Sequence, residues 1–213
     1  MTSCSMSRPE PPAALLLDLD GTLVDSEGFH RQVFRSWFAA RGWTITDEIL
    51  SGFTGRRADD VLAAEPGPWA GEDVPTMTAE LLAHMGRLPR PRLAPGAVEL
   101  VERAGVPLAL VTSATTDWAR TCLGVLLDRF TVVVTRDEVA NGKPHPEPYA
   151  VAVTALGVAA SACVAVEDAP AGVASALAAG VGTVVGVSGT FTAEQLSAAH
   201  LVVPSLDRVA ALL

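Results

Sequence analysis

The chain has 213 residues, of which 49% are hydrophobic and 18% charged, so it can bury a substantial core in one domain or two and is not a disordered protein. Its formal net charge is −9, and Lys and Arg cluster no further than short pairs, which argues against a nucleic-acid or anionic-membrane partner. No apolar stretch reaches the roughly 18 residues that a membrane-spanning helix needs.

The first dozen residues lack the apolar centre of a signal peptide, so none is expected there. We expect these residues to form a loose tail. The three cysteines, Cys4, Cys122 and Cys163, are odd in number, widely spaced and without a metal-ligand pattern. They predict reduced thiols in a cytoplasmic protein, with Cys163 in the core.

The apolar run Ala14–Leu17 is typical of a strand buried on both faces of a parallel sheet, and Gly21 lets the chain turn out of it. Asp18 and Asp20 therefore come at the carboxyl end of this strand, where open α/β sheets bind ligands. Two neighbouring acids are costly to keep ionised without a cation, which favours a hard divalent ion such as Mg²⁺. The alternative is a solvated turn with two incidental acids.

Residues 26–90 contain no good buried strand. Three runs in them have helical periodicity: Phe29–Ala40, Ala58–Ala64 and Met77–Leu88. We expect an inserted helical cap over residues 26–90, and a catalytic core made of residues 1–25 and 91–213. The Pro-rich connector at 88–96 has the stiffness that suits a hinge between them.

After the connector, strands alternate with helices. The predicted strands are Pro107–Val111, Thr131–Val134, Ala162–Val166, Thr183–Val187 and Leu201–Val203. The predicted helices are Ala97–Ala104, Trp118–Leu127, Tyr149–Leu156 and Val173–Ala179. This alternation predicts an α/β fold in which helices wrap a parallel sheet.

Polar residues stand after the second predicted strand and in a later loop. Thr112 and Ser113 close the strand that ends at Val111, where hydroxyl and backbone N–H groups can cradle phosphate; each alone is better explained as a helix cap. Lys143 lies in a loop before a helix and could neutralise a carboxylate and a phosphoryl group held close together. Taken alone, a loop lysine is more often a solvated surface residue.

A second acidic pair, Glu167 and Asp168, follows the apolar run Ala162–Val166. Acids that complement a helix dipole are the alternative. That alternative does not explain why a wholly apolar strand should end in two acids. We therefore interpret the pair as we do Asp18 and Asp20, as acids placed at the carboxyl end of a buried strand.

The order of these motifs resembles the four-motif signature of the haloacid dehalogenase-like superfamily over nearly the whole chain. The signature is carried by Asp18-x-Asp20-Gly-Thr, Thr112-Ser113, Lys143-Pro144 and Glu167-Asp168 with Gly172. The helical insertion resembles the cap of the branch that holds β-phosphoglucomutase, the sugar-phosphate phosphatases and phosphoglycolate phosphatase. The resemblance implies a Rossmann-like core with strand order 3-2-1-4-5.

The resemblance also implies a Mg²⁺-dependent phosphatase for a small phosphorylated metabolite, such as a sugar or polyol phosphate. In this reading Asp18 is the nucleophile that becomes an aspartyl-phosphate, Asp20 is the general acid and base, and Lys143 offsets charge.

The implied ion and phosphate sites draw on the same motifs. The ion would be held by Asp18, the Asp20 carbonyl and Asp168, with Glu167 orienting its surroundings. Thr112, Ser113 and Lys143 would bind the transferring phosphoryl group.

Two rival functions stay open. Relatives with dehalogenase or phosphonatase activity lack an acid at the position of Asp20, which disfavours both activities. The β-phosphoglucomutases carry cations where this chain has Thr54 and Ala58, so hydrolysis is favoured over phosphomutase activity, although Arg56 and Arg57 could supply charge. A catalytically idle binding relative is the second rival, and the presence of all the core motifs argues against it.

Candidate substrate contacts in the cap are His30, Arg56 and Arg57. His30 follows Asp18 at a spacing that the family often shows, but a lone histidine on an apolar helix is more often structural. Trp43, Trp69 and Trp118 are expected to serve packing. We expect a monomer or a weak homo-oligomer, and the sequence does not name the substrate.

Overall fold

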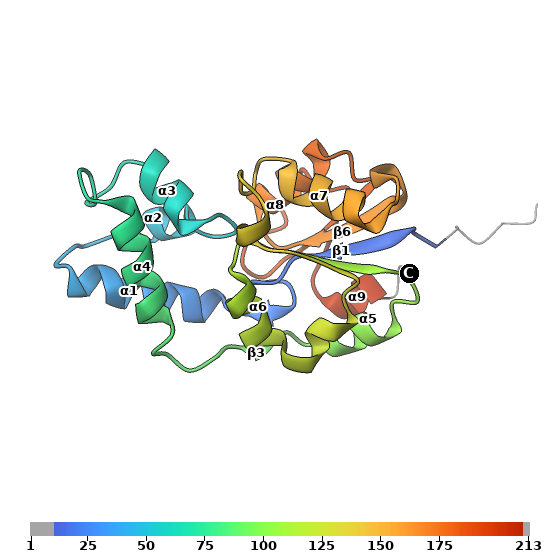
Figure 1. The fold of residues 1–213 in the computed structure, drawn as a ribbon, viewed down its shortest axis with the longest axis horizontal. Coiled ribbons are helices and arrows are strands. Elements are labelled where there is room, and N and C mark those ends of the chain that lie inside the picture. Colours follow the sequence, from blue (N-terminus) through green and yellow to red (C-terminus); the bar gives the residue numbers. More distant parts are fainter. Residues whose placement is uncertain (1–10, 211–213) are drawn as a thin grey trace, which may run out of the picture.

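The computed structural model describes residues 11–210, so Cys4 and most of the expected N-terminal tail lie outside the described residues. A six-stranded parallel sheet forms its centre, in the order β5-β4-β1-β6-β7-β8 (Figure 1). The strands are β1 (Ala14–Leu17), β4 (Leu108–Val111), β5 (Val132–Val134), β6 (Cys163–Glu167), β7 (Thr183–Val187) and β8 (Leu201–Val203). Counted along the chain they lie in the order 3-2-1-4-5-6, which confirms the predicted α/β fold and strand order and adds a sixth strand at one edge.

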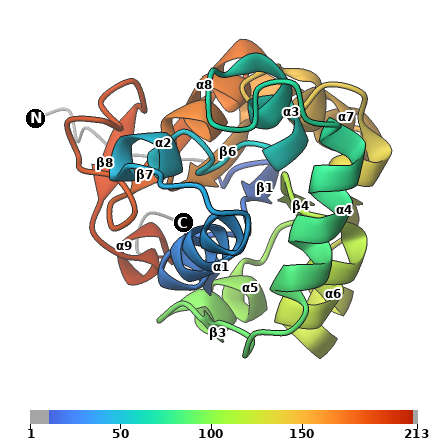
Figure 2. The ribbon, with the colours of Figure 1, turned by 90° about the vertical axis from the view of Figure 1, so that its left-hand side faces the viewer.

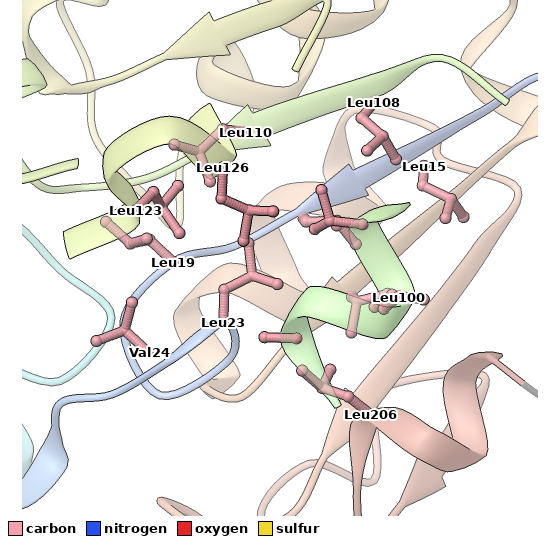
Figure 3. Packing of buried hydrophobic residues seen from close by; sticks show 14 of the residues in the cluster. Leu15, Leu19, Leu23, Val24, Leu100, Leu108, Leu110, Leu123, Leu126 and Leu206 are labelled. Atoms are coloured by element: carbon pink, nitrogen blue, oxygen red, sulfur yellow. The ribbon is translucent and has the colours of Figure 1, made fainter. Parts of the chain in front are cut away.

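Alternate side chains of β1 enter two different apolar layers. Leu15 and Leu17 belong to the cluster shown in Figure 3, whereas Ala14 and Leu16 belong to a second cluster on the other face of the sheet. The helices of the first layer are α5 (Ala97–Arg103), α6 (Thr116–Leu123) and α9 (Leu206–Ala210), and those of the second are α7 (Glu147–Leu156) and α8 (Pro170–Ala178). All four β1 side chains are fully buried, and each leucine contributes about 2 kcal/mol of hydrophobic free energy. The carboxyl end of β1 is therefore held firmly in place.

A separate group of helices lies beyond the carboxyl ends of the strands, on the left in Figure 1 and toward the viewer in Figure 2. This helical group comprises α1 (Glu27–Ala40), α2 (Asp47–Ser51), α3 (Ala58–Ala64) and α4 (Val74–Met85). It has its own apolar cluster, in which Phe38, Phe53 and Trp69 pack ring against ring. The buried residues of this cluster are distinct from those of the two layers that cover the sheet.

The helices of this group differ in detail from the predicted runs. The first begins two residues earlier, and the last runs from Val74 to Met85 rather than from Met77 to Leu88. Helix α2 was not predicted, because five residues are too short to show helical periodicity. The sequence nevertheless contains a local signal for the start of α2. The Thr46 hydroxyl accepts a 3.3 Å hydrogen bond from the Ile49 N–H, as a helix N-cap does.

The chain crosses between sheet and helical group twice, and the two crossings pair with each other. Strands β2 (Val24–Asp25) and β3 (Arg92–Leu93) form a short antiparallel ladder. The second strand lies inside the Pro-rich connector that we expected to be a hinge. Strands of two residues are too short to show periodicity in the sequence. They form here because the two crossing segments lie side by side in the folded chain.

Two further details bear on the predictions. The predicted helix Trp118–Leu127 is instead α6, followed by a 3₁₀ turn over Gly124–Arg129, because Gly124 adopts a positive φ of 54° that ends the α-helix. Cys163 is fully packed in the core as predicted. Among residues 11–210, we find no helix with the length and apolar character needed to cross a membrane.

Candidate active site

The predicted polar motifs meet at one edge of the sheet. Asp18 follows β1, Thr112 follows β4, and Glu167 ends β6 and precedes Asp168. Strands β4 and β6 both lie beside β1 and run parallel to it, so these residues share the carboxyl edge. Lys143 reaches the same edge from the loop that precedes α7.

Lys143 is the centre of this arrangement. Its ammonium donates to Asp18 Oδ1 at 2.6 Å, to Glu167 Oε1 at 2.5 Å and to the carbonyl of Val111 at 2.9 Å. Only 2% of the residue is exposed, so the surface-lysine alternative is wrong. Burial alone would lower the pKa of Lys143, but the carboxylates of Asp18 and Glu167 outweigh it and raise that pKa above its usual value. Lys143 is thus a fixed positive charge between two acids.

Tyr149 is a member of this network that sequence reasoning missed. Its hydroxyl donates a 2.5 Å hydrogen bond to Glu167 Oε1, the same oxygen that Lys143 contacts. Burial raises the pKa of Tyr149 well above its ordinary value, so the hydroxyl keeps its proton and stays a donor. The sequence predicts only that Tyr149 lies in a helix, because nothing in its local sequence indicates that its hydroxyl contacts an acid.

Three acids crowd together around this point. Carboxylate oxygens of Asp18, Glu167 and Asp168 lie within 4.8 Å of one another, and all three residues are buried. Burial, reinforced by the charge of Glu167, raises the pKa of Asp18 from 3.8 to about 7, and burial with the charge of Asp18 raises the pKa of Asp168 well above its ordinary range. The cluster holds more negative charge than Lys143 alone balances.

Several carboxylate oxygens of the cluster have no protein partner. Among the described residues, both oxygens of Asp168 and Oε2 of Glu167 are buried without a hydrogen bond. Small residues make room for these groups: a Cβ at Gly21 would lie 1.8 Å from Asp168 Oδ2, and a Cβ at Gly172 would lie 2.0 Å from the Glu167 carboxylate. Buried, unpaired oxygens of this kind fit a hard divalent cation such as Mg²⁺.

Asp20 lies at the rim of the site with two aromatic residues. The Trp118 indole N–H donates a 3.0 Å hydrogen bond to Asp20 Oδ1, and His30 Nε2 lies 3.6 Å from the same oxygen. Trp118 also stacks on Phe29, with ring centroids 5.2 Å apart. The interpretation of Trp118 as packing alone is therefore wrong, because one end of its ring packs and the other holds an acid of the site.

The two hydroxyl residues after β4 both line the pocket of the site but are also engaged locally. Thr112 Oγ1 accepts a 3.0 Å hydrogen bond from the Ala114 N–H, whereas the cap of α6 is Thr115, so the helix-cap alternative is wrong for Thr112 and Ser113. Ser113 Oγ donates to the Gly55 carbonyl at 3.2 Å and so joins the sheet edge to the helical group.

A pocket opens between the sheet edge and the helical group. Its polar end is formed by Asp18, Asp20, Asp168, Thr112 and Ser113. Much of its remaining wall comes from apolar side chains of the helical group, namely Val33, Phe34, Leu50, Phe53, Leu81, Leu82 and Met85. The pocket thus joins a strongly charged floor to a largely apolar wall.

Comparison with known proteins identifies the family. A sequence model described as "Haloacid dehalogenase-like hydrolase" matches residues 15–186, which is most of the chain. The chain is a haloacid dehalogenase-like hydrolase. The superfamily resemblance seen in the motifs is confirmed, and the protein is an enzyme of the hydrolase class.

The relatives of this haloacid dehalogenase-like hydrolase include named phosphatases. It is 37% identical to the validoxylamine A 7'-phosphate phosphatase of Streptomyces hygroscopicus subsp. limoneus over 91% of this chain and 94% of that protein. It is 36% identical to hexitol phosphatase A of Escherichia coli over 91% of each chain. The crystal structure of CbbY from Rhodobacter sphaeroides in complex with phosphate is similar in fold, with a TM-score of 0.78, 27% identity and coverage of 93% of this chain and 96% of that one.

The two arginines expected to face the substrate of this hydrolase lie in different places. Arg56 lines the pocket, but its guanidinium is paired with Glu65 at 2.9 Å. Arg57 does not line the pocket; it is 7% exposed, and its guanidinium donates to backbone carbonyls of the sheet domain. The expectation that Arg57 contacts the substrate is therefore corrected, because both of its Nη groups donate to backbone carbonyls and the residue does not line the pocket.

Proposed function

We propose that this hydrolase is a phosphatase that releases inorganic phosphate from a small phosphorylated metabolite, a sugar or polyol phosphate, through an aspartyl-phosphate on Asp18. The observation that carries the proposal is the Lys143 bridge between Asp18 and Glu167 beside buried, unpaired acid oxygens. A site of this charge pattern suits a phosphoryl group and a cation together. The relatives named validoxylamine A 7'-phosphate phosphatase and hexitol phosphatase A support the substrate class.

The residues present fit Mg²⁺. Asp18 and Asp168 would hold the ion together with the backbone carbonyl of Asp20, and Glu167 would orient its surroundings. When bound, the ion supplies positive charge that lets a carboxylate approach a phosphate dianion. Lys143 supplies further positive charge next to the Asp18 carboxylate.

The proposed reaction has two displacements at phosphorus. In the first, an Asp18 oxygen forms a bond to phosphorus, the bond to the leaving oxygen breaks, and Asp20 gives that oxygen a proton. In the second, Asp20 takes a proton from water, the water oxygen bonds to phosphorus, and the Asp18 carboxylate is released. Thr112 and Ser113 would bind the phosphoryl oxygens during both transfers.

The rim residues support the role proposed for Asp20. A general acid must keep one orientation relative to the leaving oxygen, and Trp118 and His30 both approach Asp20 Oδ1. We propose that His30 has a functional role through this contact rather than a purely structural one.

We propose that residues 26–90 act as a cap over a core formed by residues 1–25 and 91–213. The apolar cluster of the helical group and the paired crossings β2 and β3 support the division, since both favour movement of the group as one body. The cap would open to admit substrate and close to exclude water during the first transfer.

The pocket wall favours hydrolysis over phosphomutase activity. Thr54 and Ala58, which stand where the mutases carry cations, line the pocket, and the neighbouring Arg56 is already paired with Glu65. The other arginines of the lining, Arg31 and Arg136, are likewise paired with acids, so little unpaired positive charge is available to bind a second phosphate. The apolar side chains of the wall suit instead the C–H groups of a sugar or polyol.

The experiment is a measurement of phosphate release from sugar, polyol, glycolate and nucleotide monophosphates, with and without Mg²⁺. Asp18→Asn is the blank. Metal-dependent release by the unmodified protein alone supports the proposal and narrows the substrate. Isomerisation of a hexose phosphate that depends on an added bisphosphate would favour the mutase, and absence of any metal-dependent release would overturn the phosphatase.

A further inference from the structure

We propose that Arg57 is a positioning residue that joins the helical group to the loop carrying Lys143 and thereby holds Lys143 between Asp18 and Glu167. The consequence for catalysis rests on the proposed function, whereas the consequence for Lys143 itself does not. Nothing in the motif pattern assigns this role to Arg57, which is separated from Lys143 by 86 positions of the sequence.

The contacts of Arg57 all go to one short stretch of backbone. Its Nη1 donates to the carbonyl of Ala140 at 3.1 Å, and its Nη2 donates to the carbonyls of Arg136 at 3.0 Å and Val139 at 2.7 Å. A planar guanidinium can serve three acceptors in this fork geometry, which an ammonium group cannot reproduce. The stretch ends three residues before Lys143.

The same loop is held from its own domain through its N–H groups. Glu147, in the first turn of α7, accepts hydrogen bonds from the N–H groups of Ala140 and Asn141 at 2.8 and 3.0 Å. The N–H groups of the loop are thus bound within the core, and its carbonyls are bound by the helical group. Movement of the helical group would break the hydrogen bonds from Arg57 to the loop carbonyls and leave those from the loop N–H groups to Glu147 in place.

Gly142, the residue before Lys143, also contacts the side chain of Arg57. A Cβ at Gly142 would lie 2.8 Å from Arg57 Cδ and 2.9 Å from Arg57 Nε, so the backbone next to Lys143 packs against the arginine side chain. The φ of Gly142 is not positive, which means that its smallness and not its flexibility is needed here.

Two more contacts join the same segments. Arg136, in the loop that Arg57 grips, pairs in return with Asp59 at the start of α3. The Ser113 hydroxyl binds the carbonyl of Gly55, two residues before Arg57. Each side of this contact therefore supplies both hydrogen-bond donors and acceptors to the other. This is expected of a contact that forms when the helical group lies against the core.

Lys143 is the only lysine in the chain, which allows a direct test. Acetylation with N-hydroxysulfosuccinimide acetate, followed by peptide mass spectrometry, reports on this one side-chain amine, and the α-amine of the same molecules serves as an internal standard. We expect Lys143 to be acetylated at least fivefold faster in Arg57→Ala than in the unmodified protein. Arg35→Ala removes an exposed arginine that pairs within the helical group, and should leave the rate within twofold.

Gly142→Ala and Arg57→Lys are companion variants that disturb the same contact by added volume or by loss of the fork. Both should accelerate acetylation, and they replace Arg57→Ala if circular dichroism shows that it does not fold. An unchanged acetylation rate in the folded variants would overturn the proposal.

The catalytic consequence has a separate readout. We expect kcat of Arg57→Ala to fall at least tenfold while the inhibition constant of inorganic phosphate rises by a clearly smaller factor, because Arg57 does not contact Thr112 or Ser113, which bind the phosphoryl oxygens in the proposed function. If kcat falls and phosphate inhibition weakens by the same factor, Arg57 has a general structural role, and the proposal that it positions Lys143 would be overturned. If no phosphatase activity exists, the proposed function fails, but the acetylation result still decides the role of Arg57.

Discussion

The indole N–H of Trp118 donates a 3.0 Å hydrogen bond to Oδ1 of Asp20, a residue 98 positions earlier in the chain. Asp20 follows strand β1, whereas Trp118 lies in α6, so the bond joins the first motif to the helix that follows the second motif. In the proposed reaction Asp20 must give and take a proton at a defined place, so a rigid partner on its carboxylate bears directly on rate.

Trp118→Phe removes this hydrogen bond and keeps an aromatic ring against Phe29. We expect kcat to fall about three- to tenfold, because a hydrogen bond of this type contributes about 1 kcal/mol and each 1.4 kcal/mol corresponds to a factor of ten. KM should stay within twofold. Trp43→Phe, in the helical group, is the matched control and should leave kcat unchanged; an equal effect of both variants would count against a role for the bond.

Asp18→Asn replaces the proposed nucleophile by an amide of the same shape. Phosphate release should fall by more than about 1000-fold, since no residual route forms the aspartyl-phosphate. Acid quenching of the unmodified enzyme during turnover should trap phosphate on the protein, and this signal should vanish in the variant. Asp117→Asn, at a fully solvated position, is the control. Persistence of trapped phosphate in Asp18→Asn would rule out Asp18 as the nucleophile.

The free energy of unfolding of the metal-free protein should fall as the pH rises from about 4 to 7. The pKa of Asp18 is raised to about 7, so in this window the folded chain retains a proton that the unfolded chain has released, and folding becomes less favourable with each step in pH. Mg²⁺ binds the ionised carboxylates and should therefore stabilise the protein much more at pH 8 than at pH 5.

The measurement is the thermal midpoint at several pH values with and without MgCl₂. At a Mg²⁺ concentration of about 100 times Kd the gain at pH 8 should approach about 2.7 kcal/mol. Asp168→Asn removes one acid of the cluster, and should both raise the metal-free midpoint at pH 8 and reduce the gain from Mg²⁺. A midpoint that responds to neither pH nor Mg²⁺ would contradict the proposed ion site.

Lys143→Met removes the buried charge that faces Asp18 and Glu167. At pH 8 the metal-free variant should lose about 3 kcal/mol of stability, because breaking a buried pair leaves uncompensated carboxylates. The loss should be smaller at pH 5, where Asp18 can take up a proton. Urea unfolding at the two pH values measures both; a loss that is the same at each would indicate that packing of the lysine stem, and not its charge, is what matters.

Much of the core of the site was predictable because its residues can be recognised from the sequence immediately around them. Asp18 and Asp168 each stand directly after a strongly apolar strand or one residue beyond it, and parallel neighbouring strands must bring such positions to one edge. The strand order and the placement of Lys143 near this edge followed from the family resemblance.

The contacts of Arg57, Trp118 and Tyr149 were not predictable in the same way. Each residue sits in an ordinary helical or loop context, and each partner lies elsewhere in the chain: the Arg57 acceptors are about 80 positions away, and the Glu167 that Tyr149 contacts is 18 positions away. No periodicity or spacing records whether a guanidinium will meet a substrate or a backbone carbonyl.

The amino-acid sequence by itself determined the sheet, the acidic strand ends and the family, because burial pattern and strand-end chemistry are local properties that a parallel sheet converts directly into position. Only the tertiary structure decided which polar groups pair across the interface between the helical group and the core. That choice depends on distances set by packing of whole elements, and it assigned Arg57 to the Lys143 loop and Trp118 to Asp20.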